Sequence, residues 1–343
     1  MNRKILFIGS FNKDKIVAGD TVKNNILVES MIKYKVNMEM IDTTFWRKNK
    51  IATISKIAGG IARNYKSEIM ISLNTQSAKK FIYIMDAFKL IRKININYIV
   101  IGGNLPKVLD ENERYEDIYR RVKRIFVETK GMETVLKNKG LKNVHYLPNF
   151  KDYNYVPKEK RTSDKIKICF FSRVCREKGI EEVIGATEKM SSFINVETDI
   201  YGPIQESYNE HFKQRIYNSA CVFYKGVLTP NANRTYEILS DYDLMLFPTY
   251  HDGEGFPGVI IDSFIAGVPV MATKWRYNGE IVEEGKTGWL VNIKSEEEII
   301  RKIMKIYDNK DMLIRMRSNC IEKAKEFHVS RVIPELLRIM DVV

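Results

Sequence analysis

Cysteine is scarce in this sequence, and long apolar runs are missing from it. Its 343 residues include four cysteines, without CxxC or other paired spacing: Cys169, Cys175, Cys221 and Cys320. Such thiols are expected to stay reduced, as in a cytosolic protein. The apolar run at the start is too short for export, and no run of about 18 apolar residues follows that could span a bilayer. These absences predict a cytoplasmic protein without disulfides.

Negative charge is scarce in the first half of the chain. Residues 1–160 hold 31 Lys and Arg against 16 Asp and Glu, a net charge of +15, whereas residues 161–343 hold 25 against 27, a net charge of −2. This asymmetry indicates an anionic partner for the first half, such as nucleic acid, an acidic membrane face or a phosphate-bearing substrate. A generally solvated, Lys-rich surface explains the same charge.

Short apolar runs alternate with longer helical segments in two series, which predicts parallel, doubly wound sheets. The expected strands are Ile5–Ile8, Met38–Ile41, Ile69–Ser72, Tyr98–Ile101, Ile125–Glu128 and Val144–Leu147, then Ile166–Phe171, Glu197–Tyr201, Val222–Tyr224, Leu244–Phe247 and Val268–Ala272. The polar stretch KDYNYVPKEKRTSDK between the two series predicts a linker.

We therefore predict an α/β protein with two Rossmann-like domains that face a central cleft. The expected boundaries are 1–150 for the N-terminal domain, 151–164 for the linker, 165–325 for the C-terminal domain, and 326–343 for a C-terminal helix that can pack back on the N-terminal domain. The carboxyl ends of both sets of strands are expected at the cleft, where such sheets bind ligands.

The stretch HDGEGFPGVIIDSFIAGVPVMAT, at 251–273, follows an expected strand and therefore belongs at this edge. A helix is expected to start near Phe256, because Pro257 is tolerated in a first helical turn. Gly253 and Gly255 let the backbone approach a ligand closely. The free N–H groups at the helix start favour a phosphate, so the neighbouring Glu254 is expected to contact neutral hydroxyls instead.

Asp262 lies eight residues after Glu254, roughly 12 Å along the axis if the whole span is helical. This separation suits two ends of one elongated ligand, and a nucleotide sugar has that layout of hydroxyls, diphosphate and ribose. The alternative is a helix capped by Glu254 with Asp262 on a solvated face, which fits poorly with the apolar residues around Asp262. His251 adjoins the turn and is either a surface histidine or a phosphate contact.

Two basic residues follow the expected strand Ile166–Phe171, in the stretch FFSRVCREKGIEEVIGA. Arg173 and Lys178 flank the turn into a helix and could clamp a diphosphate, with forked donors from Arg and a point charge from Lys. Two basic residues in one loop are weak evidence alone. Their place on an equivalent turn of the same domain strengthens the interpretation.

These motifs resemble those of the retaining glycosyltransferases of family 4, which have the GT-B fold. The matching residues are Glu254-Gly255-Phe256, then Asp262, then Gly267-Val268-Pro269-Val270. Further matches are Ser172-Arg173, Lys178-Gly179, DIYGP, FYKGVL and GEIVEEGKTGWLV, which together cover most of residues 145–310. The resemblance over the N-terminal half is weaker.

The resemblance implies a role for each matching residue. Glu254 would bind hydroxyls of the donor sugar, and Arg173 and Lys178 would neutralise the leaving diphosphate. The other implied donor-binding residues are Ser172, Gly226, Val227, Gly255, Phe256, Pro257 and Asp262, with Asp262 at the ribose and Gly226 and Val227 at the edge of the base. Residues implied on the acceptor side are Gly19, Asp20, Gly102, Gly103 and Asn104.

The sequence departs from the family pattern at several points. Asp262 stands where the family usually has Glu, and Ser172 where it usually has Gly. The histidine that the family often carries after the fourth strand is absent, and the chain reads Gly102-Gly103-Asn104 there.

The pair Asp241 and Asp243 looks like the metal-binding Asp-x-Asp of the other main glycosyltransferase fold. It precedes an expected strand, so it would face away from the cleft, and no other cluster has metal-ligand spacing. We expect no metal and no cofactor, because basic side chains and a helix terminus can stabilise the leaving group.

The sequence thus predicts an enzyme that moves a sugar, with retention, from a UDP- or GDP-linked donor to a saccharide acceptor. The acceptor is expected to be lipid-linked, in capsule or polysaccharide assembly. The basic segment from Phe45 to Lys66 would dock on the inner face of the plasma membrane.

Two alternatives stay open. A nucleotide-sugar epimerase would share the phosphate contacts, and a basic, non-enzymatic binding module would explain the charge but not Glu254 and Asp262.

Overall fold

A computed structural model describes residues 4–11, 19–91, 94–159, 163–229 and 232–342 of the chain. The chain divides into two compact units. Unit 1 consists of Met1–Phe150 and Val329–Val343, and unit 2 consists of Lys151–His328. Each unit has its own parallel sheet and its own core. Residues 160–162 of the expected linker lie outside the described residues.

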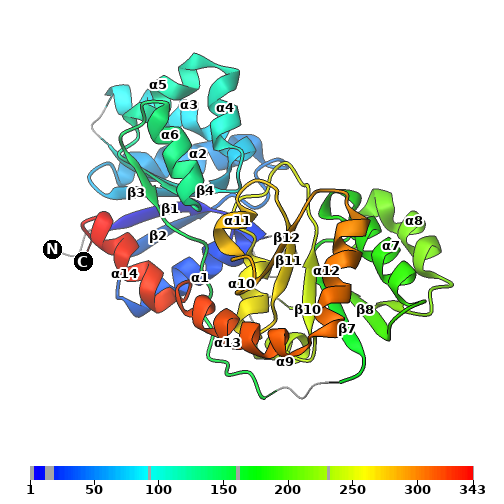
Figure 1. The fold of residues 1–343 in the computed structure, drawn as a ribbon. Helices are drawn as coiled ribbons and strands as arrows, with labels where there is room; N and C mark the ends of the chain where they lie inside the picture. Colours follow the sequence, from blue (N-terminus) through cyan, green and yellow to red (C-terminus); the bar gives the residue numbers. More distant parts are fainter. Residues whose placement is uncertain (1–3, 12–18, 92–93, 160–162, 230–231, 343) are drawn as a thin grey trace. The chain divides into compact units, whose positions relative to one another are not determined.

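Unit 1 is built on a six-stranded parallel sheet of order β2-β1-β3-β4-β5-β6 (Figure 1). Its elements are β1 (Ile5–Gly9), α1 (Gly19–Lys33), β2 (Met38–Asp42), α2 (Lys50–Arg63), β3 (Glu68–Asn74), α3 (Thr75–Ile91), β4 (Asn95–Ile101), α4 (Leu105–Glu111), α5 (Glu113–Arg121), β5 (Arg124–Val127), α6 (Lys130–Asn138), β6 (Val144–Tyr146) and α14 (Val329–Ile339). Every residue of β1 is buried, as expected for a parallel strand that is covered on both faces.

The last helix, α14, contributes to the core of unit 1. Ile333, Leu336 and Leu337 are fully buried in one apolar cluster with Leu27 of α1 and Phe7 of β1. Figure 1 shows α14 beside α1, although nearly 300 residues separate them in the chain. Unit 1 is therefore completed by a segment that follows unit 2 in the sequence.

Unit 2 has a second six-stranded parallel sheet, of order β12-β11-β10-β7-β8-β9. Its elements are β7 (Ile166–Phe171), the 3₁₀ helix η1 (Arg176–Lys178), α7 (Ile180–Met190), β8 (Val196–Tyr201), η2 (Glu206–Tyr208), α8 (Asn209–Ile216), β9 (Val222–Tyr224), α9 (Asn233–Leu239), β10 (Leu244–Phe247), α10 (Gly258–Ile265), β11 (Val270–Thr273), α11 (Asn278–Ile281), β12 (Gly288–Val291), α12 (Glu296–Asp308) and α13 (Asp311–Lys325). The two doubly wound domains predicted from the sequence are confirmed.

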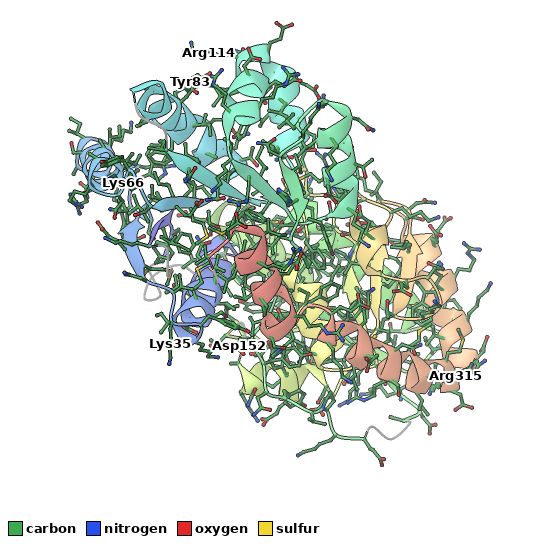
Figure 2. The ribbon with its side chains drawn as sticks, turned by 90° about the vertical axis from the view of Figure 1, so that its left-hand side faces the viewer. Lys35, Lys66, Tyr83, Arg114, Asp152 and Arg315 are labelled. Carbon is green, nitrogen blue, oxygen red and sulfur yellow. The ribbon has the colours of Figure 1, made fainter. Side chains whose placement is uncertain are left out.

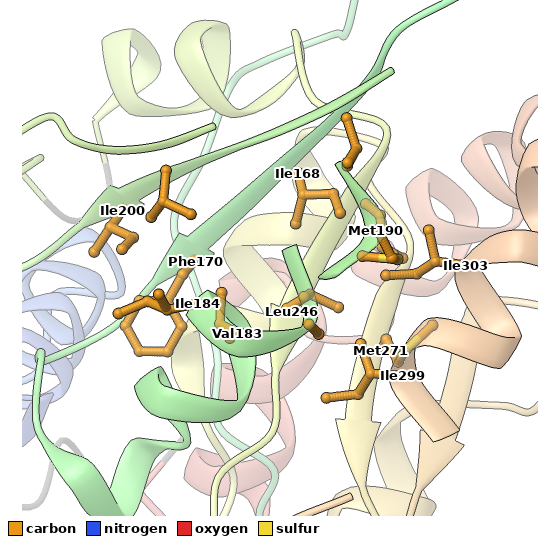
Figure 3. Packing of buried hydrophobic residues seen from close by; sticks show 14 of the residues in the cluster. Ile168, Phe170, Val183, Ile184, Met190, Ile200, Leu246, Met271, Ile299 and Ile303 are labelled. Atoms are coloured by element: carbon orange, nitrogen blue, oxygen red, sulfur yellow. The ribbon is translucent and has the colours of Figure 1, made fainter. Parts of the chain in front are cut away.

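One face of this second sheet is covered by α7 and α12. Ile299 and Ile303, one helical turn apart on α12, are fully buried in one apolar cluster, in which Figure 3 shows Ile303 near Met190 of α7 and Ile299 near Met271 of β11. Apolar residues at i and i+4 form the stripe that a helix needs to pack on a sheet. This core leaves the loops at the carboxyl edge free to carry function.

Three differences from the expected elements lie between residues 256 and 291. The strand expected at Val268–Ala272 is Val270–Thr273, because Pro269 has no N–H to give to the ladder. The helix expected near Phe256 begins at Gly258, with Pro257 as its N-cap. Strand β12 was not predicted, because Gly288 interrupts its short apolar run.

The close pairing of β12 with β11 explains why residue 288 is glycine. A Cβ at position 288 would lie 1.8 Å from the carbonyl oxygen of Val270 on the neighbouring strand. Only glycine therefore allows β12 to pair this closely with β11.

All four cysteines are buried, and no disulfide joins any of them in the described part of the chain, as the sequence predicted. Among the described residues, no helix is both long enough and apolar enough to cross a bilayer.

Candidate functional site

The sheet of unit 2 reverses its strand order between β7 and β10, which are hydrogen-bonded neighbours. In open α/β sheets, ligands bind outside the carboxyl ends of the strands at such a reversal. The turn after β7 carries Arg173 and Lys178, and the turn after β10 carries Glu254. The fold thus brings the two turns predicted from the sequence to one place.

These two turns are packed against each other. Gly179 has a φ of +79°, and a Cβ there would lie 2.3 Å from the carbonyl oxygen of Pro248. The N–H of Tyr250 donates to the carbonyl of Glu177 at 2.9 Å. Position 179 therefore requires glycine both for its backbone conformation and for its close approach.

Glu254 and Lys178 form an ion pair between the turns. Lys178 Nζ lies 2.5 Å from Glu254 Oε2, and the two side chains are only 11% and 10% exposed. The hydroxyl of Thr249, which is fully buried, donates to the same oxygen at 3.0 Å. Glu254 Oε1 has no hydrogen-bond partner within the part of the chain that the structure describes. One carboxylate oxygen is thus fixed, and the other can accept a hydrogen bond.

Arg173 takes no part in this ion pair. It is exposed, and no ion pair of its guanidinium occurs among the described residues. A planar, unpaired guanidinium on the same turn can still bind a phosphate in two-point fashion.

Backbone groups gather beside the turn after β7. Gly202, after β8, donates its N–H to the carbonyl of Gly226, after β9, at 2.9 Å. A Cβ on Gly202 would lie 1.8 Å from the carbonyl oxygen of Ser172, so the three turns form one close-packed edge. Gly226 has a φ of +87° and open space beside it, and Val227 is 53% exposed. Ser172, Gly226 and Val227 thus line the edge on the β9 side.

The turn that precedes α10 is largely buried. Gly255, Phe256 and Pro257 are buried, and the ring of Phe256 meets the ring of Phe327 edge-on with centroids 5.0 Å apart. The two-residue shift of the helix start places the first helical N–H groups at Gly258 and beyond.

Asp262 is buried, as its apolar neighbours in the sequence indicated, and both of its oxygens have protein partners. Lys151 Nζ donates to Oδ2 at 2.7 Å, and the hydroxyl of Tyr236 donates to Oδ1 at 3.3 Å. Burial raises the pKa of the Asp262 carboxyl above its usual value, although Lys151 and Tyr236 oppose this shift. The ribose contact of Asp262 stays a prediction, because the carboxylate is already satisfied within unit 2.

The residues that the resemblance implies on the acceptor side lie at the carboxyl edge of the sheet in unit 1. Gly19 and Asp20 open α1, while Gly102 and Gly103 follow β4. Asn104 is the N-cap residue of α4, and its buried Oδ1 has no partner among the described residues.

A buried ion pair stands beside this set and was not predicted. Lys23 Nζ lies 2.6 Å from Glu128 Oε1, with side chains only 3% and 4% exposed. The N–H of Gly102 donates to the other oxygen, Glu128 Oε2, at 3.2 Å. The pair thus ties α1 to the turn after β4 and to the end of β5.

Sequence reasoning missed Lys23, Glu128, Lys151, Thr249 and Tyr236. Lysine and glutamate are nearly always exposed, so a lone residue of either type gives no signal of burial. Lys151 is the first residue of a polar, Lys-rich stretch, and this composition predicted that its side chain would be exposed to solvent. Only Thr249, which directly follows Phe247 and Pro248, occupies a position that could have been singled out.

Asp241 and Asp243 lie at the amino end of β10, opposite the edge that carries Glu254. Asp243 Oδ2 accepts from the N–H of Lys167 at 2.7 Å, so this side chain extends the contact of β10 with β7. Among the described residues, no group of three or more His, Cys, Asp or Glu could hold a metal ion.

Comparison with known proteins places these turns in a wider context. The profile of the family "Glycosyl transferases group 1" matches residues 151–327. An uncharacterized glycosyltransferase of Methanocaldococcus jannaschii, MJ1069, is 24% identical over 173 residues, which are 49% of this chain and 42% of that protein. WcaL of Salmonella typhimurium, named provisionally as a colanic acid biosynthesis glycosyltransferase, is 27% identical over 110 residues, 29% of this chain and 27% of that protein.

Both alignments span less than half the length of these curated relatives. Among solved structures, Anabaena HepE in complex with UDP and glucose has a TM-score of 0.77 and 15% sequence identity, with 99% of this chain and 100% of that chain covered. This similarity confirms the GT-B fold predicted from the sequence. The family profile covers more than half of the chain, including every residue of the two packed turns. The chain therefore belongs to the glycosyl transferases of group 1.

Proposed function

We propose that this chain transfers a sugar from a nucleotide diphosphate sugar to a saccharide acceptor, with retention of configuration. The proposal depends chiefly on the hydrogen bonding of the Glu254 carboxylate, which lies at the strand-order reversal. Its Oε2 is held by Lys178 and Thr249, while Oε1 is free to accept from a hydroxyl of the donor sugar. HepE, which shares the fold, was solved with UDP-glucose, which supports a donor of this class.

In this proposal, the two basic residues act on the diphosphate. Lys178 has three N–H donors and gives one to Glu254, so its charge and remaining donors are available to a phosphate oxygen. Arg173 supplies forked donors from the same turn. Both stabilise the negative charge that develops on the leaving diphosphate. The backbone at Gly226 and Val227 would lie along the edge of the nucleotide base.

Retention follows if bond breaking and bond formation occur on one face of the sugar. The bond from C1 to the diphosphate oxygen breaks, and the acceptor oxygen bonds to C1 on the same side. The acceptor proton passes to the leaving phosphate. We favour this scheme because the motifs resemble those of retaining enzymes, and because Glu254 is fixed for hydroxyl recognition rather than for attack.

The function is tested by ligand binding followed by product analysis. A bound nucleotide diphosphate raises the unfolding temperature by mass action, so UDP and GDP should be compared by thermal shift. Sugar nucleotides that contain the preferred base are then incubated with the protein and saccharide acceptors. The anomeric configuration of the product is determined by NMR. An altered sugar nucleotide formed without any acceptor would support an epimerase instead. Salt-sensitive DNA binding without nucleotide binding would support the basic binding module.

Transfer should persist in excess chelator. Lys178 and Arg173 supply the positive charge that a metal would otherwise bring to the leaving group. The measurement is the transfer rate with and without EDTA, after exhaustive dialysis. Activity that vanishes with EDTA and returns with Mg²⁺ or Mn²⁺ would contradict the proposal and direct attention to Asp241 and Asp243.

For the acceptor, we propose a lipid-linked saccharide at an anionic membrane, in the assembly of a cell-surface polysaccharide. The provisional name of WcaL refers to such an assembly. Residues 43–67 contain six Lys and Arg and no Asp or Glu. Within this stretch, Phe45, Ile51 and Ile54 are 37%, 83% and 41% exposed.

The cations around these apolar side chains are exposed as well. Arg47, Lys48 and Lys50 have no ion-pair partner among the described residues, and Lys66 at the end of the segment is labelled in Figure 2. Exposed apolar side chains among unpaired cations are typical of a surface that binds anionic lipid. Each cation near an anionic surface contributes about 1 kcal/mol.

Binding to liposomes should therefore require anionic lipid and weaken as salt rises. The triple variant Arg47→Glu, Lys48→Glu and Lys50→Glu should lose most of this binding in a co-sedimentation assay and keep its affinity for the donor nucleotide. A matched control changes three exposed cations of unit 2 to Glu: Lys213, Lys305 and Arg315, the last labelled in Figure 2. Equal loss in both triple variants would point to net charge alone, and equal binding to neutral vesicles would rule out the electrostatic docking.

A further inference from the structure

His251 is held in place by its own backbone. Its N–H donates to Thr249 Oγ1 at 3.2 Å, and its carbonyl accepts from Trp275 Nε1 at 2.9 Å and from the N–H of Glu254 at 3.1 Å. These three bonds tie the residue to the backbone N–H of Glu254, to the Thr249 hydroxyl and to the Trp275 side chain in the turn after β11. The position of the imidazole is therefore determined by the same turn that positions Glu254.

The ring itself has one nitrogen engaged and one open. The N–H of Gly253 donates to His251 Nδ1 at 3.1 Å, and a nitrogen that accepts an N–H carries no proton. In the neutral ring the proton must then lie on Nε2, which becomes a donor. Nε2 has no hydrogen-bond partner in the described ranges of the chain. The structure thus presents an oriented N–H without an acceptor.

Burial and two nearby positive charges favour the neutral form of the ring. Burial lowers the pKa of His251, and the positive charges of Lys178 and Arg173 lower it further, whereas Glu254 and Glu177 oppose the shift. The ring is half-buried, so it is partly open to a ligand. A neutral donor beside two cations is suited to an anionic oxygen, because only the anion satisfies all three groups.

We propose that His251 is a donor-binding residue that gives its Nε2 proton in a hydrogen bond to an oxygen of the donor diphosphate. This inference rests on the proposed function and adds a third phosphate contact to Lys178 and Arg173. The Gly253 N–H fixes the tautomer and thereby the donor character of the ring. His251 acts by binding and orienting the diphosphate, and it transfers no proton.

Two variants separate the two ring nitrogens. His251→Asn keeps an oxygen where Nδ1 accepts from Gly253 and removes the donor at Nε2. His251→Gln places an amide N–H at the reach of Nε2 and loses the Nδ1 acceptor. His211→Asn is the matched control, since His211 is an exposed histidine of α8 that pairs with Glu181. All three are compared with the wild type by calorimetry with UDP or GDP, whichever the wild type binds, and with the corresponding nucleoside.

His251→Asn should bind the nucleotide diphosphate about tenfold more weakly, as expected for a lost hydrogen bond to a charged group, and should bind the nucleoside unchanged. Its unfolding temperature should stay close to that of the wild type. His251→Gln should recover part of the affinity, and His211→Asn should change nothing. A role in the turn alone would lower the unfolding temperature and leave the ratio of diphosphate to nucleoside affinity unchanged, which would overturn the inference.

NMR of protein labelled with ¹⁵N-histidine provides a second readout. His251 should show an unprotonated Nδ1 and a protonated Nε2, and the Nε2 proton should shift and be protected from exchange when the nucleotide diphosphate is added. A ring protonated on Nδ1, or an Nε2 proton that does not respond, would overturn the inference while the proposed function stands. A wild type that binds neither UDP nor GDP would overturn the proposed function and the inference together.

Discussion

Glu254→Gln should lower kcat/KM for transfer by about 10- to 150-fold, the range expected when a hydrogen bond to a charged group worth about 1.5–3 kcal/mol is lost. Its affinity for the free nucleotide diphosphate should be equal to that of the wild type or higher. The reason is the ion pair: without the carboxylate, Lys178 keeps its whole positive charge for the phosphate. The transfer rate and the calorimetric affinity are measured on the same protein preparation.

Lys178→Ala should have the opposite pattern. The diphosphate loses a cation, and the Glu254 carboxylate, only 10% exposed, is left without its partner and repels the ligand. Nucleotide affinity should therefore fall by about 10- to 150-fold. The exposed residues Glu210 and Lys213 of α8 provide matched controls as Glu210→Gln and Lys213→Ala. Full transfer activity in Glu254→Gln would show that Oε1 does not bind the sugar.

Lys151→Met should be among the most destabilising single changes in unit 2. It leaves the Asp262 carboxylate, 1% exposed, without the ammonium that lies 2.7 Å away. Breaking a buried ion pair in this way costs about 3–5 kcal/mol. The unfolding temperature should fall by about 6 to 20 °C for a domain of this size. The Lys151→Met/Asp262→Asn double variant should recover most of the loss, because no charge is buried and Asn still accepts from Tyr236.

The loss in Lys151→Met should also depend on pH. Without Lys151, burial raises the pKa of Asp262 with less opposition, so the native state keeps a proton that the unfolded state releases above about pH 4. Stability should therefore decrease further as the pH rises from that value. An unfolding temperature equal to that of the wild type at neutral pH would mean that the pair is not closed in solution.

The double variant also tests the ribose contact. Asn has one acceptor oxygen where Asp has two, and Tyr236 already donates to one oxygen at position 262, so a ribose contact through the other should be lost in the variant and nucleoside affinity should fall. If the double variant is stable and binds the nucleoside as the wild type does, Asp262 serves only to hold Lys151 and Tyr236.

Much of the fold could be predicted from the sequence, because parallel strands buried on both faces read as unbroken apolar runs. Ile166–Phe171, Val222–Tyr224 and Leu244–Phe247 have the predicted boundaries. The turns that follow them were recognised from glycine and charged residues at the strand ends. The edge strand Gly288–Val291 could not be recognised this way, because its glycine and its short length interrupt the apolar signal.

Pairings between distant residues could not be predicted. Lys151 meets Asp262 across 111 residues, and Lys23 meets Glu128 across 105 residues. Each side chain alone resembles the many solvated lysines and acids of this chain. The contact between Lys178 and Glu254 was likewise not foreseen, although both residues were singled out, because residue types and spacing do not reveal which hydrogen bonds close between two turns.

The place of α14 in the chain has a consequence for synthesis on the ribosome. The chain leaves unit 1 after Phe150 and returns to it at Val329. The whole of unit 2 is therefore translated before Ile333, Leu336 and Leu337 are synthesised. At about 5–20 residues per second, that interval lasts about 10 to 35 s. During this time the apolar side of α1 lacks the helix that covers it, whereas unit 2 can fold without interruption. The nascent first unit therefore exposes apolar surface during this interval, and such surface is prone to aggregation.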